Sequence, residues 1–420
     1  MPPQPRELSD DLLGEAFLRL PPDDPACLLR ASLTCKRWRR ILADPAFRRR
    51  HRELHGTPSV LGFLRISSGY YASRFVPNNP AASGRPAARD LPGRVVLDCR
   101  HGRVLFRAPS PLLGRKLNYD LVVWDPLTNE QRCLPRLSPP LTDVSRGHFN
   151  AAVLCSAAVE EGCDHSICHG GPFRVAFIWS QARQLHARLY SSETENWSEA
   201  ISVQKPPRNP VRLCLRMLLC SKTLVGDTLY FHYSSDYALE YQLGAQSLSI
   251  IHGPPRPGSQ ISAFFVMPMG GGGLGCMDVE EDESSLRLQL WSREAASGSD
   301  GVARWTRGRA IDLEELLPNG ALPSPRWAPD LRSRLTSVQL LGFAEGTDVI
   351  FVGTRAHARN HPGGIYMVQL NSGRARKVSA FDTAPIPFYN EMVVPYTSFC
   401  IPVTDASSTT EVPGDNASVG

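Results

Sequence analysis

The first 56 residues place apolar side chains at helical spacing, and residues that start or stop helices interrupt this pattern. Ser9 is suited to cap a first helix, and the two aspartates after it favour the first turn because of the helix dipole. The apolar positions then recur every three or four residues. They are Leu12, Leu13, Ala16, Phe17 and Leu20. Prolines at positions 21 and 22 end this predicted helix.

Two Asp-Pro pairs indicate where further helices begin. Asp24-Pro25 and Asp44-Pro45 each place a capping side chain before a proline at the first helical position. Apolar residues follow both pairs, and Gly56 is a suitable end for the last helix. The segment predicts three short helices that are too small to bury a core alone. We therefore expect a docking module for another protein, in which Leu28, Leu33 and Ile41 pack internally.

Charge is divided between the two halves of this segment. Acidic residues dominate up to Asp24, and basic residues dominate from Arg30 to Arg52. A nucleic-acid-binding patch is one interpretation of the basic half. However, the basic positions alternate with residues typical of a packed interior, namely Trp38, Ile41 and Phe47. We therefore expect a packed helical motif and no nucleic-acid partner.

After residue 56 the helical periodicity fades, and short β-type runs alternate with Gly, Pro, Asn and Ser clusters. One short helix is predicted near Ile311–Leu317. The predicted strands are Val60–Ile66, Arg94–Cys99, Gly102–Arg107, Asp120–Trp124, Gln131–Leu134, Phe149–Leu154, Phe173–Trp179, Leu185–Tyr190, Val211–Leu219, Thr228–Tyr233, Leu239–Gln242, Ser247–Ile251, Ala263–Met267, Leu286–Trp291, Ser337–Phe343, Val349–Gly353, Gly364–Leu370 and Ala375–Val378.

A loose unit recurs among these strands: a strand ends in a turn, and the next strand brings in an aromatic or aliphatic residue. Clear examples begin at Leu121, Ala187, Ala238 and Tyr366. Repeating hairpins of this kind are typical of the blades of a β-propeller, whose repeats usually measure about 40–50 residues. The spacing here is irregular, so a pair of two-sheet β-sandwiches is the alternative. The fold class predicted is α+β multidomain, with a small helical head and a mainly antiparallel all-β domain.

Low-complexity stretches indicate the domain boundaries. We predict a head over residues 1–56, a β-propeller-like domain over 57–402 with a flexible excursion near 77–90, and a disordered tail over 403–420. The glycine run 270–273 and the neighbouring acidic run 278–283 are expected to form an exposed loop, as is the segment 295–301.

Composition adds few further constraints. The net charge of +5 over 420 residues indicates no polyanionic partner, and no apolar run reaches the ~20 residues of a membrane-spanning helix. Residues 1–11 are proline-rich, polar and acidic, unlike a signal peptide. Eleven cysteines at irregular spacing predict free thiols in a reducing compartment. We expect a protein of the cytoplasm, the nucleus or both, with no membrane partner.

Three groups of residues invite catalytic or metal-binding interpretations. The loop 163–169 contains two cysteines and two histidines, but its Cys-x-x-x-x-Cys spacing is wider than a usual zinc hook and no second pair stands out. Asp98 and His101 are expected to belong to a turn, and His357 and His361 to a loop. No phosphate-binding, dinucleotide-binding or nucleophile-elbow motif is present. The sequence therefore predicts no catalytic, cofactor or metal site.

Residues 8–55 resemble an F-box. The resemblance rests on the segments 8–13, 18–21, 35–38 and 44–47, with Ser9 where the family usually has Pro. F-box helices bind a Skp-family adaptor, which joins them to a cullin–RING ubiquitin ligase. Carried onto this sequence, the resemblance implies adaptor contacts at Leu8, Asp11, Leu12, Leu13, Phe17, Leu20, Pro21, Cys35, Lys36 and Trp38.

The β-rich part also resembles a family. Residues 97–105 with 122–128, and residues 364–374 with 395–399, are similar to the F-box-associated repeat of plant F-box proteins. This resemblance implies a kelch-like propeller that binds a protein substrate. Together the two resemblances imply a non-catalytic, substrate-recognition subunit of a Skp–cullin–F-box ubiquitin ligase. The alternatives are a propeller-type scaffold that engages no cullin, or a kelch-like propeller enzyme.

Overall fold

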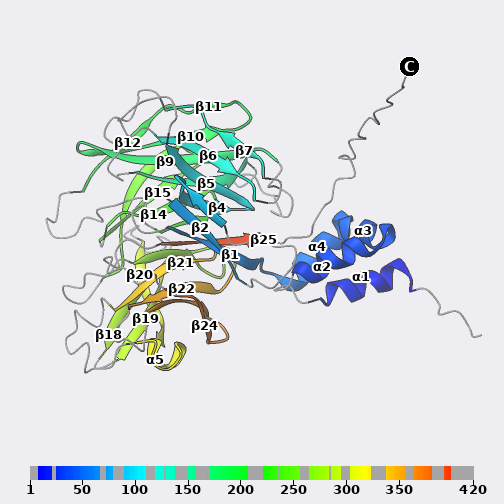
Figure 1. Ribbon diagram of the computed structural model, residues 1–420. Helices are drawn as coiled ribbons and strands as arrows, with labels where there is room; N and C mark the ends of the chain where they lie inside the picture. Colours follow the sequence, from blue (N-terminus) through cyan, green and yellow to red (C-terminus); the bar gives the residue numbers. More distant parts are fainter. Residues whose placement is uncertain are drawn as a thin grey trace, which may run out of the picture. The chain divides into compact units, whose positions relative to one another are not determined.

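The chain was examined as a computed structural model, shown in Figure 1. The structure describes residues 8–20, 25–66, 72–78, 89–109, 119–126, 129–137, 149–156, 168, 171–206, 221–234, 236–255, 264–282, 285–294, 303–322, 337–355, 363–380 and 392–398. The described residues up to Gly56 belong to one compact unit, the head, and those from Thr57 to Ser398 belong to a second unit.

The head contains four helices among its described residues. They are α1 (Asp10–Leu18), α2 (Pro25–Thr34), α3 (Lys36–Ala43) and α4 (Pro45–His55). The expected count of three was wrong because the second predicted helix divides at Cys35, whose backbone is extended with φ −158° and ψ 164°. The Cys35 side chain accepts a hydrogen bond from the backbone N–H of Trp38 at 3.5 Å, and so caps α3.

The predicted helix boundaries have the expected chemistry. Ser9 accepts a hydrogen bond from the Leu12 N–H at 3.3 Å and caps α1. Asp44 accepts one from the Ala46 N–H at 2.7 Å and caps α4. Gly56 ends α4 with φ +67°, a conformation that favours glycine. Local capping therefore explains where these helices begin and end.

The head has a small apolar core of its own, contrary to the expectation from its size. Its members come from all four helices, so each helix packs one apolar face inward. The buried members are Leu13, Phe17, Leu18, Leu28, Ala31, Leu42 and Phe47, with Leu20, Trp38 and Ile41 partly buried against them.

The second unit is a six-bladed antiparallel β-propeller. Blade 1 contains β4 (Val95–Arg100), β5 (Arg103–Pro109), β6 (Tyr119–Trp124) and β7 (Gln131–Cys133). Blade 2 contains β8 (Phe149–Cys155), β9 (Phe173–Gln181), β10 (Gln184–Ser191), β11 (Asn196–Trp197) and β12 (Ile201–Gln204). Blade 3 contains β13 (Lys222–Val225), β14 (Thr228–His232), β15 (Tyr237–Gln242) and β16 (Ser247–His252).

The remaining three blades have the same antiparallel order. Blade 4 contains β17 (Phe265–Pro268), β18 (Leu274–Asp282), β19 (Ser285–Glu294) and β20 (Arg304–Asp312). Blade 5 contains β21 (Val338–Phe343), β22 (Val349–Thr354), β23 (Gly364–Gln369) and β24 (Arg374–Ala380). Blade 6 contains β25 (Val393–Ser398), β1 (Ser59–Ile66), β2 (Ala72–Pro77) and β3 (Arg89–Pro92). A short helix, α5 (Leu313–Leu316), follows β20.

Blade 6 joins the two ends of the propeller sequence. The last described strand, β25, pairs with the first, β1, and Leu64 lies opposite Val394 in this antiparallel register. Because one blade contains strands from both ends, the ring is closed by backbone hydrogen bonds (Figure 1).

The apolar core lies between consecutive blades. For example, Phe351 of β22 packs against Phe63 of β1 with ring centroids 5.2 Å apart. Every residue of β8 and of β22 is buried, because neighbouring blades cover both faces of a strand. This explains why several strands have continuous apolar runs instead of a strict alternation.

The predicted propeller is confirmed, with three corrections to its elements. The run expected as an exposed acidic loop begins inside β18, where Asp278 and Glu280 are buried. Eight strands were not predicted, and polar or charged residues make up much of several of them: β2, β3, β11, β12, β13, β18, β20 and β25. Within the expected excursion at 77–90, Pro77 ends β2 and Arg89 begins β3. Residues 79–88, the predicted strand Val211–Leu219, segment 295–301 and the tail 403–420 lie outside the described residues.

The junction between blades 5 and 6 provides a test of ring closure. A bulge in β21 brings Gly342 so close to β25 that an added methyl group would overlap the carbonyl oxygen of Val393. We expect Gly342→Ala to lower the stability of the propeller by about 1–3 kcal/mol, measured as a lower midpoint of thermal unfolding. Gly270→Ala is the matched control, since no heavy atom lies within 4 Å of the added methyl. Equal midpoints for the two variants would contradict the close packing of β21 on β25.

Candidate functional site

Two ion pairs hold the start of α1 against the start of α3 in the head. Arg37 donates to a carboxylate oxygen of Asp10 at 2.7 Å, and Arg40 donates to the other oxygen at 2.9 Å. Arg37 also donates to the backbone carbonyl of Leu8 at 2.6 Å. These hydrogen bonds, with the positive charges of both arginines, lower the pKa of Asp10. The contacts set the position of Leu8 relative to the first turn of α3.

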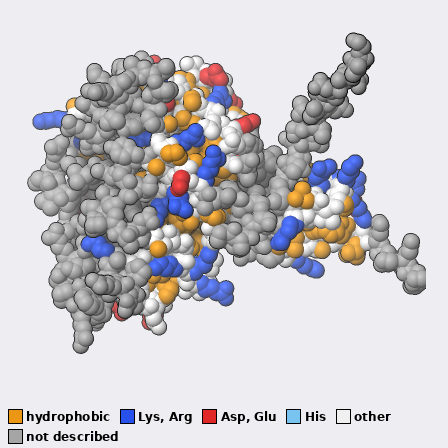
Figure 2. Space-filling model, viewed as in Figure 1, with side chains coloured by type: hydrophobic (Ala, Val, Ile, Leu, Met, Phe, Trp, Pro, Cys, Tyr) orange, Lys and Arg blue, Asp and Glu red, His pale blue; other side chains and the backbone are white. Residues whose placement is uncertain are grey.

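This arrangement leaves apolar and polar side chains exposed together. We name Leu8, Asp11, Leu12, Cys35 and Lys36 the α1–α3 surface, since all five are exposed. The side chains of Leu8 and Leu12 are 54% and 56% exposed. Leu12 lies in the first turn of α1, and Leu8 directly precedes Ser9, the N-cap of that helix. Figure 2 shows apolar and basic side chains side by side on the visible face of the head.

The other implied adaptor contacts lie deeper in the head. Leu13 and Phe17 are buried in its core, and Leu20 and Trp38 are partly buried against it. The Trp38 ring packs edge-on against Phe17 with centroids 5.1 Å apart. Pro21 lies outside the described residues. The structure therefore brings five of the ten implied residues to the surface and assigns four others a part in the core.

Sequence reasoning missed one exposed apolar residue. Leu33 was expected to pack internally, but 65% of its side chain is exposed. It lies at the last turn of α2, two residues before the Cys35 cap, where the chain leaves the helix. At about 100° per residue, Leu33 lies about 140° from Leu28 and about 160° from Ala31 around α2, so it faces away from the head core.

The last helix of the head buries an ionisable pair. His51 is buried and its ring is tilted against that of the half-buried His55, with ring centroids 4.4 Å apart. Burial, and to a smaller extent the neighbouring His55, lowers the pKa of His51 to about 4. The ring of His55 makes a 2.9 Å hydrogen-bonded contact with the carbonyl of Leu18 in α1. His51 is therefore neutral at pH 7 and belongs to the packing of α4.

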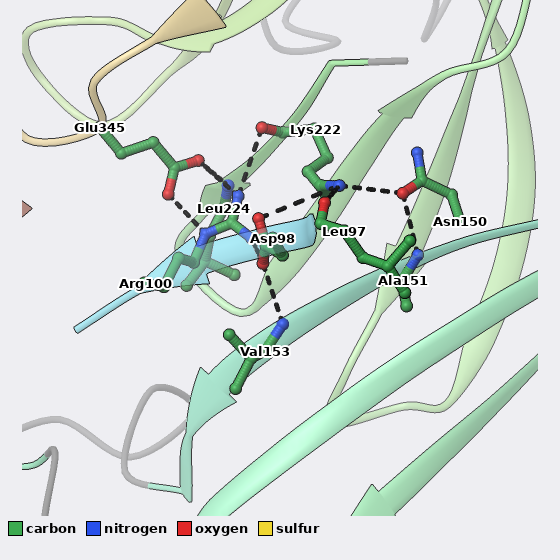
Figure 3. Close-up of polar contacts among 9 residues, drawn as sticks. All are labelled: Leu97, Asp98, Arg100, Asn150, Ala151, Val153, Lys222, Leu224 and Glu345. Atoms are coloured by element: carbon green, nitrogen blue, oxygen red, sulfur yellow. Dashed lines mark hydrogen bonds and ion pairs between the residues drawn. The ribbon is translucent and has the colours of Figure 1, made fainter. Parts of the chain in front are cut away.

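In the propeller, Arg100 is the centre of a buried polar network (Figure 3). Its guanidinium donates to Glu345 at 2.5 and 2.8 Å and also forms an ion pair with Asp98. Asp98 accepts a further hydrogen bond from the backbone N–H of Val153 at 2.9 Å. Glu345 accepts one from the backbone N–H of Leu224 at 3.1 Å. Both carboxylates therefore have several donors.

A second cation completes this network. The ammonium of Lys222 donates to the backbone carbonyl of Leu97 and, at 2.9 Å, to the side-chain oxygen of Asn150. It also lies 4.0 Å from Asp98, and the carbonyl of Lys222 accepts from Arg100 at 3.3 Å. These residues come from β4, β8, β13 and the turn after β21. The network therefore connects blades 1, 2, 3 and 5.

The electrostatics of this network favour the charged forms of Arg100 and Glu345. Burial raises the pKa of the Glu345 carboxyl, but the charge and hydrogen bonds of Arg100 outweigh burial and hold this pKa below its ordinary value. Burial likewise opposes the charged form of Arg100, yet the two carboxylates raise its pKa. A buried charge of either sign would be costly alone. Arg100 and Glu345 therefore depend on each other for their charged forms.

The head matches a known domain. Residues 6–50 match the sequence model of the F-box domain. The head carries an F-box domain. The predicted family resemblance of residues 8–55 is thereby confirmed, and the propeller that follows it has the predicted architecture.

The relatives of the whole chain are more distant. The F-box protein At5g03970 of Arabidopsis thaliana is 26% identical over 204 residues, which cover 45% of this chain and 45% of that protein. This chain therefore spans less than half the length of that relative. Among solved structures, TolB from Acinetobacter baumannii is 9% identical, covers 84% of this chain and 71% of its own, and has a TM-score of 0.41.

A second solved structure is the β-propeller domain of Cps50 (Swd1) from Myceliophteria thermophila. It is 10% identical, with coverage of 76% of this chain and 86% of that domain, and its TM-score is 0.34. At these TM-scores neither structure adds to the fold assignment, which rests on the strand pairing. Within the described part of the chain, every helix is too short or too polar to cross a membrane.

Outside the F-box domain, the structure describes three of the residues considered for catalysis or metal binding, namely Asp98, His101 and Cys168. Asp98 lies inside β4 and belongs to the Arg100 network, so its assignment to a turn was wrong. His101 does lie in a turn, with φ +50°. Cys168 lies near His101, whereas the rest of the loop 163–169 and the segment 356–362, which contains His357 and His361, are outside the described residues.

The buried His51 predicts a pH dependence of the F-box domain. Its folded pKa of about 4 lies below the ordinary value of 6.5, so the unfolded chain binds the proton more readily. The stabilisation is complete above pH 6.5 and is lost as the pH falls toward 4, on the order of 3 kcal/mol in total.

This loss is measured by hydrogen exchange of α4 peptides at pH 7 and pH 5, after correction for intrinsic rates. We expect protection to fall at pH 5 in the natural chain, and to change much less in His51→Leu. The same loss of protection in both proteins would show that another group is responsible.

The Arg100 network predicts a large loss of stability for a single substitution. Arg100→Met leaves the buried carboxylate of Asp98 and the partly buried carboxylate of Glu345 without their main counter-charge, which costs about 3–5 kcal/mol. The matched control is Arg74→Met, because Arg74 forms an exposed pair with Asp90 at 3.6 Å and such pairs contribute less than about 1 kcal/mol. The measurement is the thermal unfolding midpoint of each full-length variant. A midpoint for Arg100→Met as high as that of Arg74→Met would disprove a stabilising role for the network.

Proposed function

We propose that this protein is the substrate-recognition subunit of a Skp–cullin–F-box ubiquitin ligase. The observation that carries the proposal is the F-box domain at the N-terminus, followed by a closed six-bladed propeller. The name of the Arabidopsis relative, an F-box protein, agrees with this combination. The proposal divides the chain into an adaptor-binding head over 1–56, a substrate-binding propeller over 57–402 and a tail over 403–420.

The adaptor in this proposal is a Skp-family protein that binds the α1–α3 surface. Leu8 and Leu12 supply exposed apolar side chains, and burying each is worth about 1.5–3 kcal/mol. Lys36 and Asp11 lie on the same surface and supply charged contacts at its rim. The remaining implied contacts, Leu13, Phe17, Leu20, Pro21 and Trp38, support this surface or extend it.

Leu33 is an additional candidate contact. Its exposed side chain adds apolar area next to the cap of α3, where Cys35 and Lys36 are also exposed. Covering this side chain with a partner would add about 1.5–3 kcal/mol of apolar burial to the interface. We therefore include Leu33 with the α1–α3 surface in the proposed interface.

The mechanism proposed is tethering. The head attaches the chain to the ligase, and the propeller holds a target protein so that target lysines reach the charged ubiquitin-conjugating enzyme. The gain in rate comes from effective concentration, so no catalytic group is required within this chain. A protein substrate binds to the loops of the propeller, where binding specificity is usually found. The proposed location is the cytoplasm, the nucleus or both, and neither nucleic acid nor a membrane is a proposed partner.

Two exposed leucines allow a matched test of the adaptor interface. Leu12 is 56% exposed on α1, and Leu54 is 60% exposed on α4, outside the proposed interface. We expect Leu12→Asp to weaken binding to a purified Skp-family adaptor at least tenfold, about 1.4 kcal/mol, because a charge would be buried at the interface. Leu54→Asp is expected to change the affinity less than about twofold, or roughly 0.4 kcal/mol.

The measurement is isothermal titration calorimetry of the full-length variants. Substitution of Leu13 is a poorer test, since this side chain is buried in the head core and a charge there would unfold the F-box domain. Unchanged binding by Leu12→Asp, or equal losses in both variants, would contradict the assignment of the α1–α3 surface.

A further inference from the structure

Three side chains of types that bind metals meet at the junction of blades 1 and 2. His101, Cys155 and Cys168 each offer one ligand atom, and these atoms all lie within 4.8 Å of one another. Cys155 is buried, and the other two residues are half-buried. Neither cysteine forms a disulfide. A histidine and two thiols at one point form a donor set that soft or borderline metal ions prefer.

The fold determines the position of each of the three side chains. His101 and Gly102 form the two-residue turn between β4 and β5, with φ +50° and φ +78°, and the paired residues Arg100 and Arg103 flank it. Two positive φ values in succession are typical of the tight type I′ turn of β-hairpins. The imidazole is therefore attached to a rigid hairpin tip.

The two cysteines lie at opposite ends of the connection between β8 and β9. Cys155 is the last residue of β8 and lies opposite Phe173, the first residue of β9. Cys168 precedes β9, and its backbone carbonyl accepts a 3.0 Å hydrogen bond from the N–H of Gly171. Because β8 and β9 are antiparallel, Cys155 and Cys168 lie at the same end of blade 2.

Arg103 supports this cluster from blade 1. It is buried, donates to the backbone carbonyls of Cys168 and Gly171, and hydrogen bonds with the side chain of Cys168. Its guanidinium lies 5.4 Å from the centre of the Phe173 ring, which orients it further. These contacts hold Cys168 in place beside the cluster.

We propose that His101, Cys155 and Cys168 bind a zinc ion that fastens the β4–β5 hairpin of blade 1 to blade 2. Two thiolates and a neutral imidazole balance the double positive charge of zinc. The positive charge of Arg103 then faces Asp125, a buried carboxylate that acts on it electrostatically. The cluster therefore has a matched set of charges when zinc is bound.

The distances require only a small adjustment. Zn–S bonds of about 2.3 Å and Zn–N bonds of about 2.0–2.1 Å in a tetrahedron keep ligand atoms roughly 3.5–3.8 Å apart. Contraction from within 4.8 Å to that spacing is about 1 Å, which side-chain rotation provides. Three ligands leave one tetrahedral position for water or a further donor. The site is outside the F-box domain and beyond the proposed ligase function, and its zinc links the β4–β5 hairpin to blade 2.

The ligands come from three separate segments, which explains why sequence spacing predicted no metal site. Cys168 belongs to the loop singled out for its cysteines and histidines, but its partners lie 67 and 13 positions earlier, by subtraction of the residue numbers. Only the pairing of β4 with β5 and of β8 with β9 brings them together.

The test is metal analysis of the purified full-length protein. We expect about one zinc per chain after gel filtration, measured by plasma mass spectrometry. After removal of zinc with a chelator, titration with cobalt(II) is expected to give a thiolate-to-cobalt charge-transfer band in the near ultraviolet and intense tetrahedral bands in the visible. Cys155→Ser with Cys168→Ser should lose both the zinc and the charge-transfer band.

Two further variants keep the result interpretable. His101→Asn retains a residue that tolerates positive φ, so the hairpin is preserved while one ligand is lost; zinc affinity should fall at least tenfold. Cys133→Ser removes an exposed thiol on β7 outside the cluster and should keep full zinc content. Circular dichroism verifies that each variant is folded.

Absence of both stoichiometric zinc and the cobalt–thiolate band from the folded natural protein would overturn the proposal. The same bands in the double serine variant would also overturn it, because the thiolates would then come from elsewhere. A Cys155–Cys168 disulfide in protein purified with its thiols protected, detected by mass spectrometry after alkylation, would be a third contrary result. Adaptor binding is independent of all three outcomes.

Discussion

The paired charges of Arg100 are the constraint on which the propeller most depends. One guanidinium on β4 contacts a carboxylate on its own strand, a carboxylate after β21 and a backbone carbonyl of β13. In a closed ring of six blades, blades 1, 3 and 5 occupy alternate positions, so contacts among them cross the centre of the ring. Burying these groups is costly, and only their simultaneous arrangement compensates the cost. The network therefore favours one arrangement of the blades around the ring. It acts in addition to the apolar contacts between neighbouring blades.

In the F-box domain the charged pairs lie outside the core. Its core is apolar, and its ion pairs lie near the surface, where Arg37 and Arg40 hold Asp10. Such exposed pairs contribute little to stability. Their effect is positional, since they keep the start of α1 beside α3 and leave the side chains of Leu8 and Leu12 in water. An interface whose residues are already arranged loses less conformational entropy when a partner binds. The head thus combines a small independent core with a preorganised apolar surface.

Much of this architecture could be predicted from local sequence signals, and the failures have physical causes. Caps such as Ser9 and Asp44 act within one turn of helix, so they were predictable. Strand β18 was missed because Asp278 and Glu280 look like loop residues, although they are buried in the sheet and Arg307 pairs with Glu280. That contact depends on the pairing of separate strands, and the hydrophobic periodicity of the sequence does not reveal which strands pair. The Arg100 network and the cluster at His101 were unpredictable for the same reason.

The central claim is that the head joins this propeller to a cullin-based ligase. The most direct measurement is size-exclusion chromatography with multi-angle light scattering on the full-length chain mixed with a purified Skp-family adaptor and a cullin. The account predicts a single ternary complex with one copy of each protein, and no complex between the chain and the cullin when the adaptor is omitted. Elution of this chain apart from the adaptor would contradict the account. A complex with the adaptor that excludes the cullin would contradict the ligase role and leave a scaffold.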